Sequence, residues 1–408
     1  MRIATSTIYE TGTSQLGSLQ SKVAKTQQQL ATNRRMLTPS DDPIAAARAL
    51  EVTQSKSVNS QFAVNRENAR ASLAQVERAL SSTTSLIQDV QSVAVRAGNG
   101  VLSAADRESL AVELSGNLED LLGIANSADG TGNYLFAGYK SNTVPFGQTA
   151  TGAQYVGDQG QRQLQVGSAR QIAISDSGSS VFENNPTGNG TFTMREASGN
   201  TGAGIVSTGS VSNAGALTGH KYEISFAVSG TPAVTTYSVL DKNTGAAPAS
   251  APGAQPFTSG QQIEFDGMAF NVKGVPAAGD KFTAEPSSKQ SVFTTLTDLI
   301  KTLRAPASGP ADIAKLSNGL NRAQANLTSS LDNVLSVRAS VGSRMKELDT
   351  LDSAGEDLNI QYETTLSNLQ DLDVVKAISE FTQQQAQLEA AQMSFKSLSG
   401  LSLFNYIS

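Results

Sequence analysis

Residues 16–37 read LGSLQSKVAKTQQQLATNRRML, and residues 378–398 read ISEFTQQQAQLEAAQMSFKSL. In the first stretch, alternating steps of three and four fall on Leu16, Leu19, Val23, Thr26, Leu30, Asn33 and Leu37. In the second stretch, the same steps fall on Ile378, Phe381, Gln385, Leu388, Gln392, Phe395 and Leu398. Such stripes are typical of coiled-coil helices and need apolar partners. Because they lie near the two ends of the chain, where single domains usually fray, they predict an assembly interface.

Four positions of these stripes are polar: Thr26, Asn33, Gln385 and Gln392. Inside a helix seam, such residues lower stability but fix the register and exclude wrong partners. On a helix that is apolar on one side only, the same residues face solvent, and the sequence favours neither alternative. An isolated helix of this length is marginal in water. The two terminal helices are therefore expected to need each other and neighbouring chains.

Composition bounds the kind of protein. The chain has 408 residues, a net charge of −6, 16% charged and 5% aromatic residues, and neither Cys nor Trp. The negative charge argues against a nucleic-acid partner, and no basic amphipathic stretch suggests a membrane partner. No apolar run approaches the ~20 residues that a bilayer requires. Residues 1–20 are polar and do not resemble a cleavable secretory signal.

Glycine and proline divide the chain. Most of the 35 Gly lie between residues 130 and 279, and most of the 12 Pro between residues 145 and 286. These are turn residues, so the middle is expected to be rich in strands and the flanks helical. The predicted fold is α+β, with an elongated helical bundle and coiled-coil arms from both ends around inserted antiparallel β structure. We expect assembly helices at 1–42 and 356–408, a bundle at 43–140 and 291–355, and β structure at 141–290.

Local signals set the expected helix ends. Thr38-Pro39 should end the first helix, because the residue before proline avoids the helical region. Asp42 and Pro43 should open a helix to about residue 96, and Ser103 should cap the next one. Gly309-Pro310 should open a long helix, and Gly355 is the expected break before the last helix, at about 359–398.

Alternating apolar residues predict strands in the middle. Tyr222, Ile224, Phe226 and Val228 form one strand face. Asp266-Gly267 between two apolar runs predicts a type I′ hairpin. Residues 157–160 (GDQG), between apolar pairs, predict a second hairpin.

Catalytic chemistry has little support. His220 is the only histidine, so no histidine-pair metal site exists and a catalytic triad would depend on this residue. Its place before a predicted strand indicates an exposed residue at a loop edge. The acids of the middle block lie mostly beside Gly or Asn, where turns recruit them. The sequence therefore predicts no enzyme, no metal and no cofactor.

Several strings resemble the flagellin family. They are MRIAT at 1–5, LTPSDDPIAAARAL at 37–50, GNYLFAGY at 132–139, DLD at 371–373 leading into Ala377-Ile378, and SLFNYI at 402–407. The segment at 267–282, with GVPAAGD at 274–280, is similar to a β motif of that family. The resemblance is strong over 1–140 and 340–408 and weaker over 141–290.

Membership of this family implies terminal helices that form the inner tubes of a tubular assembly, with β domains turned outward. Within the family, the strings are most similar to members that join hook to filament. The implied partners are its own copies in a ring or short helical layer, another hook-associated protein, flagellin and an export chaperone. The implied location is the extracellular flagellum, reached by type III export. Two alternatives remain: a filament subunit, or a secreted coiled-coil adhesin that binds through the β block.

Overall fold

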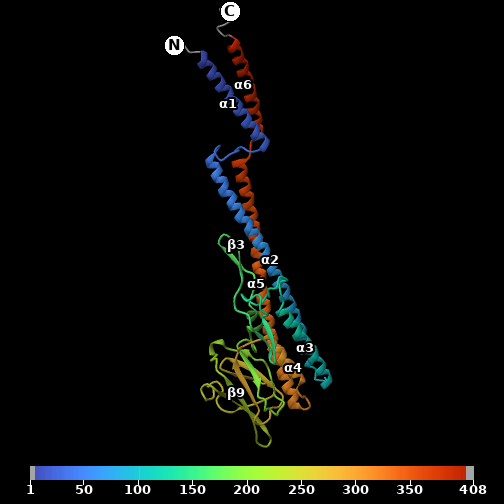
Figure 1. Ribbon diagram of the computed structural model, residues 1–408. Helices are drawn as coiled ribbons and strands as arrows, with labels where there is room; N and C mark the ends of the chain where they lie inside the picture. Colours follow the sequence, from blue (N-terminus) through green and yellow to red (C-terminus); the bar gives the residue numbers. More distant parts are fainter. Residues whose placement is uncertain (1–4, 101, 401–408) are drawn as a thin grey trace, which may run out of the picture. The chain divides into compact units, whose positions relative to one another are not determined.

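The computed structural model describes residues 5–100 and 102–400, with long helices on both flanks and strands in the middle (Figure 1). This is the α+β fold expected from the sequence. The helices of the described residues are α1 (Thr5–Thr32), α2 (Pro43–Ala97), α3 (Ala104–Ala125), α4 (Val292–Arg304), α5 (Pro310–Gln370) and α6 (Val374–Gly400). A five-residue π-helix (Ser179–Glu183) and a short 3-10 helix (Ala214–Ala216) lie within the strand-rich part.

The chain divides into two compact units. One consists of Met1–Val64 with Thr350–Ser408, and the other is Asn65–Asp349. Both boundaries fall inside α2 and α5, whereas the sequence predicts limits at residues 42, 140, 290 and 355. Long helices that run from one unit into the next leave no composition signal at the boundary, so residue patterns place the limits at helix ends instead.

Helix starts follow the predicted signals. The Asp42 carboxylate accepts a hydrogen bond from Ala45 N at 3.0 Å, and Pro43 is the first residue of α2. Ser103 and Asp106 form a complete capping box at the start of α3. Pro310 opens α5, as expected.

Three predicted helix ends are wrong. The first helix stops at Thr32 and not at Thr38, because Asn33 adopts a left-handed conformation with φ 53°. Gly355 does not break α5, which continues to Gln370. The buried Gly355 carbonyl instead accepts a hydrogen bond from Asn59 Nδ2 of α2 at 2.8 Å. The last helix begins at Val374, where Asp373 caps it through Lys376 N at 3.0 Å.

Antiparallel strands occupy the middle of the chain. They are β1 (Phe146–Thr149), β2 (Gly152–Tyr155), β3 (Gln163–Gly167), β4 (Arg170–Ala173), β5 (Asn185–Pro186), β6 (Phe192–Glu196), β7 (Ile205–Val206), β8 (Ser210–Val211), β9 (Tyr222–Ser229), β10 (Val234–Asp241), β11 (Gln255–Pro256), β12 (Gln262–Phe265), β13 (Met268–Lys273), β14 (Lys281–Pro286) and β15 (Lys289–Gln290). One sheet has the order β11-β10-β9-β14-β6, and another has the order β12-β13-β7 with β8 beside β13.

These two sheets share one apolar core. Tyr222, Ile224 and Phe226 point into it from β9, but Val228 is 38% exposed, so the predicted face ends one position early. The predicted Asp266-Gly267 hairpin is confirmed: both residues have positive φ, and Phe265 pairs with Met268. All core residues lie between Phe192 and Ala284. This part therefore has a core of its own.

The second predicted hairpin is wrong. β2 pairs with β1, and β3 pairs with β4, so residues 157–160 connect two different ribbons. The carboxylate of Asp158 accepts hydrogen bonds from the backbone N–H groups of Tyr139, Lys140 and Gly160, at 2.8, 3.0 and 2.8 Å. A side chain at Gly138 would strike Asp158 at 2.3 Å. Glycine is therefore required at position 138 because the backbone there approaches Asp158 closely, and residues 157–160 do not form a hairpin turn.

A row of asparagines on α5 holds the strand-rich part. Asn318 accepts from Val206 N at 2.8 Å and donates to the Gly204 carbonyl at 3.0 Å. About two helical turns further along α5, the side chain of Asn326 accepts a hydrogen bond from Gly188 N at 2.9 Å. Both side chains are buried and take the place of strand partners for irregular backbone.

The β domain closes at a narrow base. Thr187 N donates to the Ser288 carbonyl at 2.9 Å, and β5 pairs with β15 just outside this point. Residues before the base belong to the helical part: Phe146, Phe182 and Phe293 form a ring cluster with centroids 5.0–5.8 Å apart. Residues 187–288 therefore form the compact β domain, and 141–186 pack with the helices.

Excision of residues 188–287, with a short Gly-Ser link from Thr187 to Ser288, should leave the remaining helices folded. The two ends already contact each other, and the aromatic cluster stays complete. Circular dichroism should show retained helix and a cooperative melt.

Excision of residues 150–285 is the matched comparison, because it removes Phe182 and breaks the aromatic cluster. It should melt at a lower temperature or aggregate. Equal melting of both excision variants would contradict the assignment of 141–186 to the helical part.

Candidate assembly interface

The two terminal helices pack along a thin seam. Helix α1 contributes Gly12, Leu16, Leu19, Val23, Thr26 and Leu30, at steps of four and three. Helix α6 contributes Ala377, Phe381, Gln384, Leu388, Ala391 and Phe395, again at steps of four and three. Figure 1 shows the two helices running side by side. Most of these side chains are only half-buried.

Two contacts fix how the helices oppose each other. Thr26 Oγ1 donates to Gln384 Oε1 at 2.9 Å, and Thr26 is 5% exposed. Near the other end, the ring of Phe395 lies edge-on to Tyr9, with centroids 5.4 Å apart. Phe395 covers Gly12, where a Cβ atom would come within 2.8 Å of the ring. The missing side chain of Gly12 therefore makes room for Phe395.

The predicted stripes agree with this seam only in part. Leu16, Leu19, Val23, Leu30, Phe381, Leu388 and Phe395 lie on it, and Thr26 is the polar seam residue that the sequence predicts. Ile378, Gln385 and Gln392 are exposed on the neighbouring side of α6. The prediction merged two stripes one residue apart, because Ile378 is more apolar than Ala377 and the pattern gives no reason to prefer alanine. The side chain of Leu398 lies outside the described residues, as do positions 1–4 and 401–408.

Asn33 and Leu37 are not on the seam. Both lie after the end of α1, in the link to α2. The Asn33 carbonyl accepts a hydrogen bond from Leu372 N at 3.3 Å, and Arg34 bridges Asp371 as in an antiparallel pair. The two connections, 33–42 and 371–373, therefore contact each other directly. What reads as two more turns of helix is a joint between helix pairs.

Asp41 organises this link. Its carboxylate accepts from Leu37 N and Thr38 N, each at 3.0 Å, and from Lys25 Nζ at 2.7 Å. The Lys25 hydrogen bond, followed by the backbone hydrogen bonds from Thr38 and Leu37, lowers the pKa of Asp41 from 3.8 to about 2. The carboxylate is thus fully ionised at neutral pH and ties the link to α1.

Arg35 ties the same link to the end of α5. Its backbone N–H donates to the Gln370 carbonyl at 2.8 Å, and its guanidinium donates to the Leu369 carbonyl at 2.8 Å. These carbonyls belong to the last turn of α5, which lacks partners within the helix. Residues 37–42, whose sequence resembles that of the flagellin family, thus form with Arg35 an ordered link that is held by hydrogen bonds.

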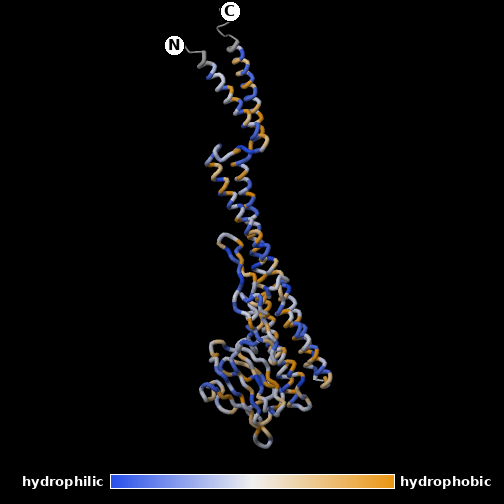
Figure 2. The backbone as a smooth tube through the Cα atoms, viewed as in Figure 1, coloured by the Kyte–Doolittle hydropathy of each residue, from blue (hydrophilic) through white to orange (hydrophobic). Residues whose placement is uncertain are grey.

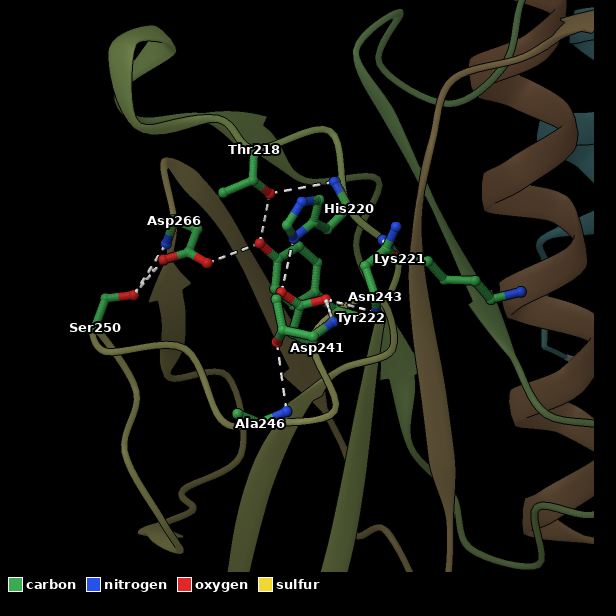
Figure 3. Close-up of polar contacts among 10 residues, drawn as sticks. Thr218, His220, Lys221, Tyr222, Asp241, Asn243, Ala246, Ser250 and Asp266 are labelled. Atoms are coloured by element: carbon green, nitrogen blue, oxygen red, sulfur yellow. Dashed lines mark hydrogen bonds and ion pairs between the residues drawn. The ribbon is translucent and has the colours of Figure 1, made fainter.

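The only histidine lies in the β domain, where Figure 3 shows its polar neighbours. Its Nδ1 is 2.7 Å from Asp241 Oδ2, so His220 joins the start of β9 to the end of β10 and is not the exposed loop-edge residue expected. Burial raises the pKa of Tyr222 to about 12, and its hydroxyl donates to Asp266 at 2.7 Å. Thr218 lies 2.6 Å from that hydroxyl. These groups link neighbouring strands. Among the described residues, the hydrogen-bond partner of the imidazole is the Asp241 carboxylate and not a hydroxyl group.

Neither a metal-binding cluster nor a membrane span occurs in the described part of the chain. No group of three or more His, Cys, Asp or Glu residues there could hold a metal ion. Among residues 5–100 and 102–400, no helix combines the length and apolarity needed to cross a bilayer. Figure 2 agrees, with hydrophilic and hydrophobic positions mixed along α1 and α6.

Sequence reasoning missed the residues that make the seam narrow. Gly12, Ala377 and Ala391 are small, and Gln384 owes its place to one hydrogen bond. Small residues at two of the six seam positions of α6 are a usable signal for close helix packing, but only once the partner helix is known.

Two terminal helices that pair, continue through a joint into longer helices, and carry an inserted β domain define a flagellin-type subunit. The family model of the bacterial flagellin N-terminal helical region matches residues 3–141. Flagellar hook-associated protein 3 of Salmonella typhimurium is 32% identical over 405 residues, which covers 99% of each chain. The crystal structure of flagellar hook-associated protein 3 from Legionella pneumophila has a TM-score of 0.73 and 33% identity, and covers 78% of this chain and 98% of its own.

A flagellin gives a shorter match. Flagellin FlaB1 of Treponema pallidum is 30% identical over 129 residues, which is 31% of this chain and 45% of that flagellin. The chain belongs to the family of flagellar hook-associated protein 3, as the match over its whole length shows, and it is a structural component of the bacterial flagellum. The expected membership of the flagellin family is confirmed, and a filament subunit is not favoured.

Substitution of Lys25 by Gln should raise the pKa of Asp41 from about 2 towards 3.8, because its strongest hydrogen bond is lost. The pKa is lower in the folded chain than in the unfolded chain. Asp41 therefore stabilises the link above pH 3.8, and this contribution disappears as the pH falls towards about 2. The carboxyl carbon-13 shift of labelled aspartate, followed against pH, measures this. Lys22→Gln, at an exposed lysine of the same helix, should leave the titration unchanged.

Gly12→Ala and Gly17→Ala should act in opposite directions although both lie in α1. Alanine favours a helix over glycine by about 1 kcal/mol. At Gly17 the new methyl group meets no atom within 4 Å, but at Gly12 it displaces the Phe395 ring. Hydrogen exchange of the α1 and α6 amides should slow in Gly17→Ala and quicken in Gly12→Ala. Slower exchange in both variants would show that the ring contact contributes nothing.

Proposed function

We propose that copies of this chain join one another, and the flagellar parts next to them, through the α1–α6 helix pair. The chain is a structural flagellar component of the hook–filament junction family. In the proposed arrangement, the terminal helix pairs form the wall of a short tube or ring between hook and filament. The β domain is turned outward and takes no part in closing the tube. This role is structural and needs no catalysis.

One observation carries this proposal: the pair is too thinly packed to be a finished structure. Among the side chains described in α1 and α6, only Thr26 and Ala377 are buried. By contrast, α4 buries seven of its thirteen residues. Full burial of a large apolar side chain contributes about 1.5–3 kcal/mol, and these seams obtain only part of it. Helices with so little burial gain their remaining stability from neighbouring molecules.

The interface that we propose includes both stripes of the pair. Its residues are Leu16, Leu19, Val23, Thr26 and Leu30 on α1, Ile378, Phe381, Gln385, Leu388, Gln392, Phe395 and Leu398 on α6, and Asn33 and Leu37 in the link. The seam residues hold the pair together, and the exposed residues of α6 are available to a neighbour. The link orients the pair on the helices that follow.

The proposed partners follow from the same surface. Besides its own copies, the tube meets another hook-associated protein on one side and flagellin on the other. Before assembly, the exposed apolar residues of α6 need cover, which an export chaperone would supply. The place of work is the extracellular flagellum, between hook and filament.

Substitution of Leu388 by Asp should abolish assembly while leaving the unit at 65–349 folded. A carboxylate in the half-buried seam separates α6 from α1, and no seam residue belongs to the other unit. The measurement is complementation of a deletion strain, with electron microscopy of the cells and flagellin measured in the medium. The variant should give bare hooks and lost flagellin.

Leu335→Asp, at a leucine of α5 that is 42% exposed, is the control for the introduced charge. It should keep the melting temperature of the unit at 65–349. Intact filaments in the Leu388→Asp strain would contradict the proposal. A collapsed melt of the whole variant protein would show that the two units depend on each other.

A further inference from the structure

A pocket opens between α2 and the turn that follows α3. Its volume of about 430 Å³ is within the range of roughly 300–1,000 Å³ that small-molecule sites occupy. The lining comes from one face of α2, from the last turn of α3 and from the turn at 127–135. All of these residues belong to the unit at 65–349. The pocket is therefore distinct from the α1–α6 pair.

The turn at 127–135 is held in place by its own hydrogen bonds. Leu135 N donates to the Ser127 carbonyl at 3.0 Å, and Asp129 N donates to the Asn133 carbonyl at 2.8 Å. The Asp129 carboxylate accepts hydrogen bonds from Thr131 and Asn133. Burial would raise the pKa of Asp129, but these hydrogen bonds lower it to about 2. This wall of the pocket is thus preformed, and its carboxylate is ionised and already engaged.

The pocket has an apolar floor. Ala79 of α2 is 8% exposed, and Leu135 of the turn is 4% exposed. Ile124 of α3, which is half-buried, lines the same pocket. These three side chains leave the space above them open. Such a floor suits the hydrocarbon part of a ligand, because covering it removes apolar surface from water.

Two polar groups of the pocket lack partners within the described part of the chain. Gln75 Nε2 donates to the Asp129 carbonyl at 3.5 Å, but Gln75 Oε1 is buried and accepts no hydrogen bond. Arg78 lies three residues further along the same face of α2 and is exposed. Its guanidinium forms no ion pair with a described residue, whereas Arg338 pairs with Glu77 at 2.6 Å. A buried acceptor without a donor is unfavourable, so a ligand with both an anionic group and a donor would satisfy this pocket.

We propose that this pocket binds an α-carboxylate that carries an adjacent N–H group and an apolar side chain. Arg78 binds the carboxylate, because a guanidinium can pair with both carboxylate oxygens at once. The N–H group donates to Gln75 Oε1, and the side chain of the ligand packs on Ala79, Ile124 and Leu135. A free aliphatic amino acid presents these three groups, and so does the last residue of a peptide. The inference does not depend on the proposed function.

Other ligand chemistry fits the pocket less well. A multiply charged anion meets only one cation among the described lining residues, Arg78, and is repelled by the ionised Asp129. An entirely apolar ligand would leave Gln75 Oε1 without a donor. A ligand with one negative charge, one donor and a hydrocarbon part uses every feature of the lining.

Saturation-transfer NMR, observed on the ligand and performed with the full-length monomer, tests the site with leucine and N-acetylleucine as probes. A signal from leucine alone identifies a free amino acid, because only leucine has an ammonium group. A signal from N-acetylleucine, with or without leucine, identifies the end of a peptide. Leucinamide lacks the carboxylate and should give no signal. Silence from both acids, or a leucinamide signal as strong as theirs, would overturn the proposal.

Variants of α2 separate binding from folding. Arg78→Gln should weaken binding of the acid about tenfold or more, because a charge-assisted hydrogen-bonded pair is lost. Arg48→Gln, at an exposed arginine of the same helix outside the pocket, should leave the affinity unchanged. Gln75→Leu should weaken binding of the acid but not of isocaproate, which has the same carboxylate and hydrocarbon part and no N–H group.

Circular dichroism melts of the same variants provide the control for stability. Arg78 is exposed, so Arg78→Gln should melt like the natural chain. Unchanged affinity of Arg78→Gln at an unchanged melting temperature would contradict the site. That result would leave the proposed function standing, because the pocket and the helix seam lie in different units.

Discussion

The shortage of buried surface between α1 and α6 is the constraint on which the rest of the structure depends. A pair of helices with 28 and 27 residues has only Thr26 and Ala377 buried among its described side chains. The seam is narrow because Gly12, Ala377 and Ala391 give up side-chain volume, which brings the helices close but buries little. Such a pair is held in one register by a few specific contacts although it buries little surface, which is the observation behind the proposed role in assembly.

The joint below the pair solves a related problem. Two helices end and two begin within a few residues, which leaves many backbone N–H and carbonyl groups without partners. Asp41 accepts hydrogen bonds from two of these N–H groups. Asp42 and Asp373 cap the helices α2 and α6. Arg35 donates hydrogen bonds to the last carbonyl groups of α5. The polar string that opens with Thr38-Pro39 is thus a dense set of side-chain-to-backbone bonds. These hydrogen bonds order the link although it has no fully buried apolar residue of its own.

Sequence reasoning succeeded where the signal is local and failed where it depends on a distant partner. Caps at Asp42 and Ser103, and the Asp266-Gly267 hairpin, follow from residues within four positions of each other. Gly157–Gly160 reads as a hairpin, but its glycines make room for contacts with Tyr139 and Tyr155, which the local pattern does not reveal. The two stripes of α6 differ by one residue, and only the position of α1 decides which of them is the seam. Asn318 and Asn326 look like ordinary polar helix residues until the β domain is in place.

The β domain is attached through contacts within its own unit. The domain has its own apolar core, a closed base at Thr187 and Ser288, and buried asparagines of α5 that hold its backbone. None of these contacts involves the unit that contains α1 and α6. Changes in the β domain should therefore leave the α1–α6 pair untouched, and changes in the seam should leave the β core intact. The fold therefore allows the β core and the helix seam to be altered one at a time.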